Sequence, residues 1–260
     1  MNREDFFVEL RQKCNNETEY LLELLKLRGF LFENLHGELR LSDMSYKEDA
    51  WFLNDLLVQC FCGKMKGKEV FLLSKPNIAA MEKVFADNPP IEGAYENDAN
   101  GRSTFKHRIH GETVPVELLD PFIARYIKAI SACSVPTIAS CDGNHPQMNQ
   151  MYLMIKDRTS RIWHKLICVM CLAGVYEIKW NADCTAIEFD EKTKYNTYWE
   201  LNRAAEYLYD HRQIIRGILN TAMMDLAGCF FQEHSADEIE NAFINKVTQL
   251  FCNSVLLRVR

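Results

Sequence analysis

The segment "DPFIARYIKAISACSVPTIASCDGNHPQMNQMYLMI" covers residues 120–155 and combines the signals of a helix, a polar loop and two strands. Asp120 followed by Pro121 is typical of a helix start, because Asp caps the first turn and Pro fits the first helical position. Apolar residues with helical spacing follow, and short extended runs at 137–140 and 151–155 enclose the polar loop. This order predicts a helix packed beside a pair of strands.

Further helix starts are predicted outside this segment. Ser45, Thr197 and Ser235 each precede a glutamate by three residues, which is the capping-box pattern. Each is followed by an amphipathic run, and the run after Thr197 predicts one long helix over residues 198–227. We interpret the apolar stripes of these helices as core, because such stripes are more often buried than ligand-binding.

The order of helices and strands along the chain predicts an α+β fold. We expect a small, mostly antiparallel sheet covered by helices. Three units are expected: a mostly helical lobe at residues 1–86, a polar loop or lid at 87–114, and an α+β domain with long C-terminal helices at 115–260. Besides the two strands already named, the predicted strands are 69–74, 175–180 and 184–189.

Composition and charge exclude several classes of protein. The chain has 260 residues, 48% of them hydrophobic and 25% charged, with a net charge of −6. Proteins that bind duplex nucleic acid usually present a basic face, so the acidic balance argues against that partner. No apolar run reaches the roughly 18 residues of a membrane span, and the N-terminus lacks an apolar signal core. We therefore expect a cytoplasmic protein that does not associate with membranes.

The ten cysteines lie mostly within apolar runs. Without an export signal, they are expected to be reduced and buried rather than joined in disulfides. The pairs Cys60–Cys62 and Cys168–Cys171 have spacings found in metal or redox sites, but both lie in apolar helical stretches. We interpret these two pairs as buried thiols.

A cluster of basic residues follows the second strand of the opening segment. A strand of this length separates the two ends of a hairpin by roughly 17 Å, so this cluster is expected at the opposite end of the sheet from the polar loop. We interpret the cluster as a solvated helix start, with contact to a phosphate or an acidic partner as the alternative. Its members are Lys156, Arg158, Arg161, His164 and Lys165.

The polar loop holds the candidate catalytic residues Cys141, Asp142 and His145. If the helix from Pro121 packs antiparallel to the strand that it feeds, its N-terminus lies beside this loop. The helix dipole then favours a thiolate or an anionic substrate group there. Asp-Gly-Asn is also ordinary turn chemistry, so a purely structural role of the loop stays open.

The same geometry brings the segment before the helix to the loop. This segment contains His107 and His110, whose spacing lets both side chains face one way in a helical turn. Together with Cys141 and His145 they offer the imidazole and thiolate ligands that suit zinc or another divalent metal. The candidate metal ligands are therefore His107, His110, Cys141 and His145, although the two upstream histidines could simply belong to a disordered loop.

Several well-known catalytic motifs are missing from the sequence. It contains no phosphate-binding loop of the form G-x-x-x-x-G-K-[ST], no G-x-G-x-x-G after a strand, no H-E-x-x-H and no G-x-S-x-G elbow. Standard P-loop nucleotide hydrolysis, a Rossmann cofactor, zincin proteolysis and α/β-hydrolase chemistry are therefore disfavoured.

The loop Ser140-Cys141-Asp142-Gly143-Asn144-His145 resembles the S-C-x-G-H loops of uncharacterised phage and prophage proteins. It is more distantly similar to the S-C-S-G loop of the tRNA wybutosine-synthesis family. The likeness covers little more than residues 120–155, and this chain departs from it by placing Asn144 between the glycine and the histidine. The resemblance implies an origin in a mobile element and does not extend to tRNA modification, because only the one loop matches.

Two functions from different classes stay open. The first is a cytosolic enzyme whose metal, held by the ligands above, activates water against a phosphate or an amide, with Asp142 as general base or orienting residue. A metal-free variant would use Cys141 as nucleophile and His145 as base. The second is a non-catalytic regulator or inhibitor of phage or mobile-element origin that binds a host protein complex through its acidic surface and the 87–114 loop. In that case the 198–227 helix could support a homo-oligomer.

Overall fold

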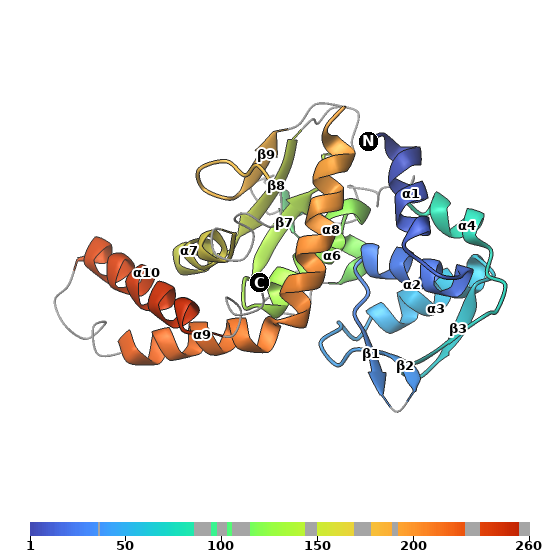
Figure 1. Ribbon diagram of the computed structural model, residues 1–260, viewed down its shortest axis with the longest axis horizontal. Helices are drawn as coiled ribbons and strands as arrows, with labels where there is room; N and C mark the ends of the chain where they lie inside the picture. Colours follow the sequence, from blue (N-terminus) through green and yellow to red (C-terminus); the bar gives the residue numbers. More distant parts are fainter. Residues whose placement is uncertain are drawn as a thin grey trace.

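The computed structural model describes residues 1–35, 37–85, 95–97, 103–105, 115–143, 150–168, 178–188, 192–226 and 235–254. These residues contain nine α-helices, one short 3-10 helix and nine strands (Figure 1). The strands form sheets of four, two and three strands, and each ladder is antiparallel. The α+β class predicted from the sequence is confirmed.

The N-terminal part combines helices with a four-stranded sheet of order β1-β2-β4-β3. Only β4 coincides with a strand predicted from the sequence, the one expected over residues 69–74. The elements are α1 (Arg3–Gln12), α2 (Glu17–Leu27), β1 (Phe32–Leu35), β2 (Glu38–Leu41), α3 (Asp49–Gln59), β3 (Gly63–Lys66), β4 (Glu69–Leu72) and α4 (Ile78–Lys83).

The sheet that carries the polar loop has the order β7-β8-β9. Thr137 pairs with Ile155 and Cys141 with Tyr152, so Cys141 and the basic cluster after Ile155 lie at opposite ends of the strand pair, as predicted. The remaining elements are β5 (Tyr95–Asn97), β6 (Ser103–Phe105), η1 (Val116–Leu118), α6 (Pro121–Ala132), β7 (Thr137–Cys141), β8 (Gln150–Ile155), α7 (Arg158–Ile167), β9 (Ala186–Glu188), α8 (Lys194–Asp210), α9 (Arg212–Leu226) and α10 (Ala236–Cys252).

Helix α6 is the centre of the molecule, and all of its residues are buried. It packs against α8, α2 and β7, and in Figure 1 it lies partly behind α8. Its two cations are paired: Lys128 Nζ lies 2.9 Å from Asp49 Oδ2, and Arg125 Nη1 donates to Asn202 Oδ1 at 2.7 Å. Because an unpaired buried charge is very costly, the first of these pairs ties α3 firmly to α6.

The long helix predicted over residues 198–227 is wrong: the chain forms α8 and α9, with a break at His211. Side chains at the break bond the last carbonyl groups of α8. His211 Nδ1 lies 2.8 Å from the Tyr207 carbonyl oxygen, and Arg212 Nη1 donates to the Tyr209 carbonyl oxygen at 2.7 Å. Side-chain capping of this kind ends a helix even where the apolar pattern continues.

The capping-box predictions had mixed outcomes. Ser235 caps α10 in a complete box with Glu238. Thr197 instead lies inside α8, which begins at Lys194. Ser45 does not cap α3, because α3 begins at Asp49 and the Asp49 carboxylate itself accepts from the Tyr46 N–H at 3.0 Å.

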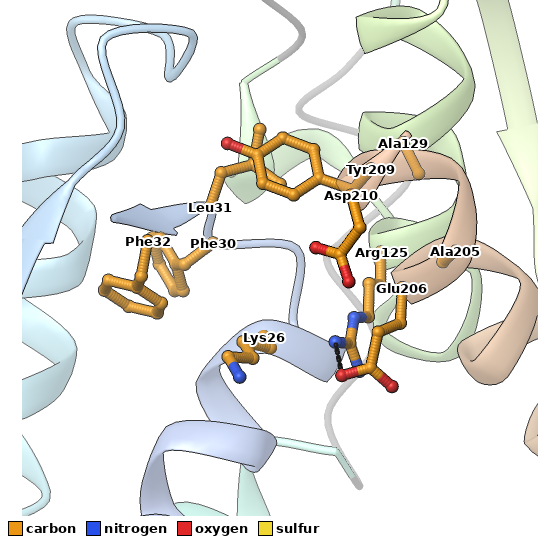
Figure 2. Close-up of a pocket in the computed structure, with 10 residues that line it drawn as sticks. All are labelled: Lys26, Phe30, Leu31, Phe32, Arg125, Ala129, Ala205, Glu206, Tyr209 and Asp210. Atoms are coloured by element: carbon orange, nitrogen blue, oxygen red, sulfur yellow. Dashed lines mark ion pairs between the residues drawn. The ribbon is translucent and has the colours of Figure 1, made fainter. Parts of the chain in front are cut away.

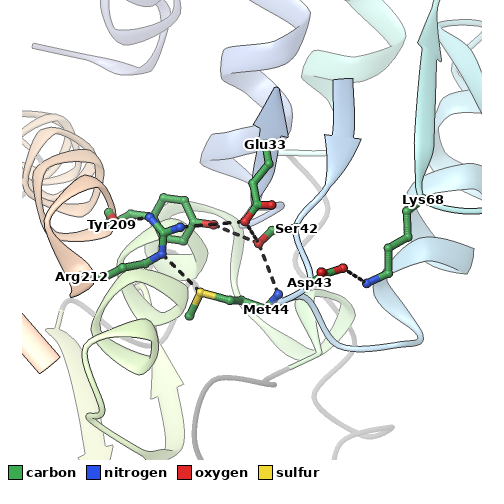
Figure 3. Close-up of polar contacts among 7 residues, drawn as sticks. All are labelled: Glu33, Ser42, Asp43, Met44, Lys68, Tyr209 and Arg212. Carbon is green, nitrogen blue, oxygen red and sulfur yellow. Dashed lines mark hydrogen bonds and ion pairs between the residues drawn. The ribbon is translucent and has the colours of Figure 1, made fainter. Parts of the chain in front are cut away.

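The junction between α8 and α9 contacts the N-terminal sheet (Figure 3). The Tyr209 hydroxyl donates to Ser42 Oγ at 3.1 Å, and Ser42 Oγ donates to Glu33 Oε1 at 2.6 Å. The Arg212 guanidinium lies 4.0 Å from the centre of the Tyr209 ring and pairs with Glu33 at 3.9 Å. These contacts fix the break in the helix against β1 and the end of β2.

Candidate functional site

The C-terminal end of β7 meets the N-terminal end of α6. The Asp142 N–H donates to Asp120 Oδ2 at 3.0 Å, and the Phe122 N–H donates to Asp142 Oδ2 at 3.4 Å. Each aspartate thus accepts a backbone hydrogen bond at the residues that join the strand end to the helix start. The predicted contact between the polar loop and this helix is confirmed for Asp142.

Asp120, Cys141 and Asp142 form a compact group of metal-type ligands. One oxygen of each carboxyl group and the Cys141 sulfur all lie within 4.8 Å of one another. All three residues are buried, with exposed fractions of 8%, 5% and 0%. A thiolate and carboxylate oxygens are ligands that zinc accepts in proteins, so this group could hold a metal ion.

The Cys141 thiol is strongly biased towards its protonated form. Burial raises its pKa to about 12, and the charges of Asp120 and Asp142 act in the same direction. The Gly143 N–H donates to Cys141 Sγ at 3.3 Å and opposes this shift. A thiolate at this position therefore needs a nearby cation more than it needs a general base.

Aromatic side chains cover one side of the group. The Tyr198 hydroxyl donates to the Asp142 carbonyl oxygen at 2.6 Å. Its ring stacks on Phe122, with ring centres 4.6 Å apart and planes 9° from parallel. Burial raises the pKa of Tyr198, and Asp142 is the largest charge that adds to this rise. Tyr198 therefore stays a neutral hydrogen-bond donor that holds the backbone of the loop.

A buried arginine lies close to the two aspartates. Arg28 Nη1 donates to the carbonyl oxygens of Val116 at 2.8 Å and Leu119 at 3.0 Å. Burial lowers its pKa to about 10, while the charges of Asp120, Asp49 and Asp142 oppose this shift. The N-terminal part thus supplies a cation that offsets part of the negative charge of the site. Arg28 lies more than ninety residues before Asp120 in the sequence, and no local pattern indicated this role.

Of the predicted site residues, the structure brings together Cys141 and Asp142. His107, His110 and His145 lie outside the described residues. Asp120, which was predicted only as a helix cap, makes no side-chain capping bond and instead faces the thiol. The signal that could have revealed it was the predicted contact between the helix start and the polar loop.

The basic cluster is not entirely solvated, because His164 is completely buried. Its Nε2 lies 2.9 Å from the Tyr126 hydroxyl and 3.5 Å from Cys168 Sγ. Burial lowers the pKa of His164 to about 4, so the imidazole is neutral at physiological pH. The prediction of a solvated helix start is therefore wrong for His164, which lies on the apolar face of α7 beside Trp163.

Comparison with known proteins gives no match that could name a family. No family model matches the sequence, and no curated protein or solved structure matches the chain. The resemblance of the polar loop to phage proteins and to the wybutosine-synthesis family therefore stays a prediction. Among the described helices, none is both long enough and apolar enough to cross a membrane.

Proposed function

We propose that this chain is a cytosolic metal-dependent enzyme that hydrolyses a phosphate- or amide-bearing substrate. A divalent ion, zinc in the first instance, would be held by Asp120, Cys141 and Asp142. The observation that supports this proposal is the convergence of two carboxyl groups and one thiol within 4.8 Å at a strand end. Mixed sulfur and oxygen donors suit zinc better than magnesium or calcium, which prefer oxygen ligands alone.

The raised pKa of Cys141 favours the metal-dependent mechanism over the metal-free one. With its pKa raised to about 12, the thiol is almost wholly protonated at neutral pH and is a poor nucleophile. A bound divalent cation reverses this situation, because its charge stabilises the thiolate and is in turn stabilised by the two carboxylates. The same burial that disables a bare nucleophile thus suits a metal ligand.

Catalysis would need a water molecule on the metal and a residue that orients it. A zinc ion with three protein ligands keeps a fourth position for water, whose pKa it lowers towards neutrality. Asp142 accepts the Phe122 N–H with one oxygen, which fits an orienting role better than that of a mobile base. His145, two residues beyond Gly143, is our candidate for the general base or a further ligand.

The decisive experiment is metal analysis of the purified, untagged protein by plasma mass spectrometry. Wild type is compared with Cys141→Ser, Asp120→Asn and the matched control Cys62→Ser, which changes a buried thiol far from the aspartates in sequence. Near-stoichiometric zinc that is lost in the first two variants and kept in the control supports the site. Failure of the wild type to bind added zinc, manganese or cobalt removes the proposal.

A metal-loaded protein would then be screened against phosphomonoesters, phosphodiesters and acylated amines. We expect hydrolysis of at least one class, abolished by Cys141→Ser and unchanged in Cys62→Ser. Bound metal without turnover of any class would reduce the proposal to a structural metal site.

One observation favours the second candidate function, a non-catalytic protein-binding regulator. Trp51, Val58 and Phe61 on and just after α3 are 70%, 52% and 73% exposed, which is unusual for large apolar side chains. Trp51 and Val58 share one face of the helix by their spacing. In a pull-down from host lysate, Trp51→Ser with Phe61→Ser should abolish capture of a partner that wild type retains. Capture unaffected by this double change would contradict a role of this face.

A further inference from the structure

Two polar neighbourhoods of α6 lie outside the candidate metal site. The first is a cavity of about 120 Å³, in which Arg125 Nη2 lies 3.5 Å from Glu206 Oε1 (Figure 2). Lys26 and Asp210 also line it, so its two cations balance its two acids and it favours no charged ligand. The second neighbourhood surrounds Tyr126 and contains thiols, which carry reactive chemistry of their own.

Cys168, which directly follows α7, has its sulfur held by two side chains. Its Sγ lies 3.5 Å from His164 Nε2 and 3.7 Å from the Tyr126 hydroxyl oxygen. The His164 ring packs edge-on against Trp180, with ring centres 5.4 Å apart. These contacts fix the position of the sulfur beside α6.

Cys184 reaches the same place from a tight turn before β9. Its N–H donates to the Asn181 carbonyl oxygen at 2.9 Å, and the Asn181 side chain accepts from the N–H groups of Thr185 and Ala186 at 2.8 Å and 3.1 Å. The turn gives Cys184 a φ of 53°, in the left-handed region that few residues with a side chain adopt. Glycine or asparagine would fit this conformation better, so the turn itself does not account for a cysteine.

The contact between the two cysteines does account for it. His164, which contacts Cys168, also hydrogen-bonds the backbone of Cys184. The Cys168 thiol donates to the Cys184 sulfur, and this bond lowers the pKa of Cys184 to about 7 against the opposing effect of burial, with support from the charge of Lys165. At neutral pH about half of Cys184 is therefore thiolate, the form that attacks an electrophile. The sulfurs of a disulfide approach to about 2 Å, and two thiols already in contact are close to that geometry.

The small exposed fractions of the two thiols limit which oxidant reaches them. Cys168 is 6% exposed and Cys184 is 8% exposed. A bulky disulfide such as oxidised glutathione is kept away from sulfurs that are so deeply covered. Hydrogen peroxide is uncharged and little larger than water, so it is the class of oxidant that suits this pair.

We propose that Cys184 and Cys168 form a thiol pair that a small hydroperoxide oxidises reversibly to a disulfide. Cys184 is the attacking residue and Cys168 is the resolving residue. The pair is separate from Asp120, Cys141 and Asp142, and it stands or falls independently of the proposed metal chemistry.

The oxidation takes place in two steps. The Cys184 thiolate attacks one peroxide oxygen: an S–O bond forms, the O–O bond breaks, and the departing hydroxide takes the Cys168 thiol proton and becomes water. The Cys168 thiolate then attacks the Cys184 sulfur, so that the S–S bond forms, the S–O bond breaks and the second hydroxide leaves as water with a proton from solvent. The two sulfurs lose two electrons and the peroxide gains them, and a dithiol reductant reverses the change.

The test begins with the full, reduced wild-type chain treated with hydrogen peroxide. Free thiols are then alkylated, and the peptides are mapped by mass spectrometry without reduction. We expect a disulfide between the peptides that contain Cys168 and Cys184, lost after treatment with dithiothreitol and scarcely formed with oxidised glutathione. Absence of this link, or a link from Cys184 mainly to a different cysteine, overturns the proposal.

Variants assign the partner of Cys184. Trypsin leaves Cys168 and Cys171 in one peptide, so Cys171→Ser is the matched control. The disulfide should persist in Cys171→Ser and be lost in Cys168→Ser. The opposite pattern contradicts the pair.

The order of attack is tested by trapping the intermediate. In Cys168→Ser the sulfenic acid on Cys184 has no resolving thiol, so dimedone should label Cys184 several-fold more than in the wild type. In Cys184→Ser, Cys168 should stay reduced under the same treatment. Oxidation of Cys168 in Cys184→Ser, in a protein whose melting temperature matches that of the wild type, would overturn the assignment of Cys184 as the attacking residue.

Discussion

Buried thiols lie at two places beside α6, and the two places differ in the charge of the surrounding side chains. Cys141 lies at the start of α6 among carboxyl groups, and burial raises its pKa to about 12. Cys184 belongs to a group with Cys168 and His164 further along the helix, and a hydrogen bond from Cys168 lowers its pKa to about 7. Thiols of similar burial can therefore be either firmly protonated or acidic, depending on whether their neighbours carry negative charge or donate hydrogen bonds.

The largest expected effect concerns the charged surroundings of α6. Asp49→Asn leaves the Lys128 ammonium buried without its carboxylate, and the free energy of unfolding should fall by about 3 to 5 kcal/mol. Chemical denaturation measures this loss. Asp55→Asn, on the same helix but exposed, should change it by less than about 0.5 kcal/mol. Equal effects of the two substitutions would show that the buried pair contributes little.

A smaller effect on stability is expected at acidic pH from the neutral imidazole of His164. The pKa of His164 is lowered from 6.5 to about 4 in the folded chain, so between these values only the unfolded chain takes up the proton. Stability from this residue is present above pH 6.5 and is lost as the pH falls to about 4, by about 3 kcal/mol in all.

The measurement is the free energy of unfolding at a series of pH values. His164→Gln should flatten the slope between pH 6.5 and 4, whatever its effect on stability at neutral pH. An unchanged slope in His164→Gln would mean that other groups govern the acid response.

The smallest expected effect is kinetic and compares the two thiol groups directly. Cys141 and Cys184 are 5% and 8% exposed, so differences in access are small. At pH 8, Cys184 should react with iodoacetamide at least tenfold faster than Cys141, because far more of it is thiolate. Peptide mass spectrometry over time gives both rates.

A second variant sharpens this comparison. Cys168→Ala removes the hydrogen bond that lowers the pKa of Cys184 and should slow its alkylation several-fold. Faster reaction of Cys141 than of Cys184 in the wild type would invert the assignment of the two groups.

Local sequence signals predicted the parts of the fold that depend on neighbouring residues. Asp120-Pro121 marked the start of α6, and Ser235 with Glu238 marked that of α10. The prediction at Ser45 failed because contacts with residues distant in the sequence decide where α3 begins. The Asp49 carboxylate binds Lys128 and the Val116 N–H, and α3 begins at this residue. A local capping pattern carries no information about a partner almost eighty residues away.

Only part of the candidate site was predicted, because local patterns again show neighbouring residues and miss distant ones. Cys141 and Asp142 stood out as polar residues that end an apolar run, and strand-helix geometry placed them beside Pro121. Asp120 and Arg28 were missed as site residues, since a helix cap and a lone arginine are ordinary locally and acquire a role only through contacts across the fold.

The break between α8 and α9 has a consequence for how the chain folds during synthesis. Tyr209 and Arg212 complete the contacts of Ser42 and Glu33, which precede them by about 170 residues. The first sheet can form its own ladder early, but its outer edge finds these partners only after most of the chain has left the ribosome. Contacts of such high sequence separation slow folding and leave surfaces exposed in the interval. Nascent chains that stop before residue 209 should therefore be the ones that engage chaperones most strongly.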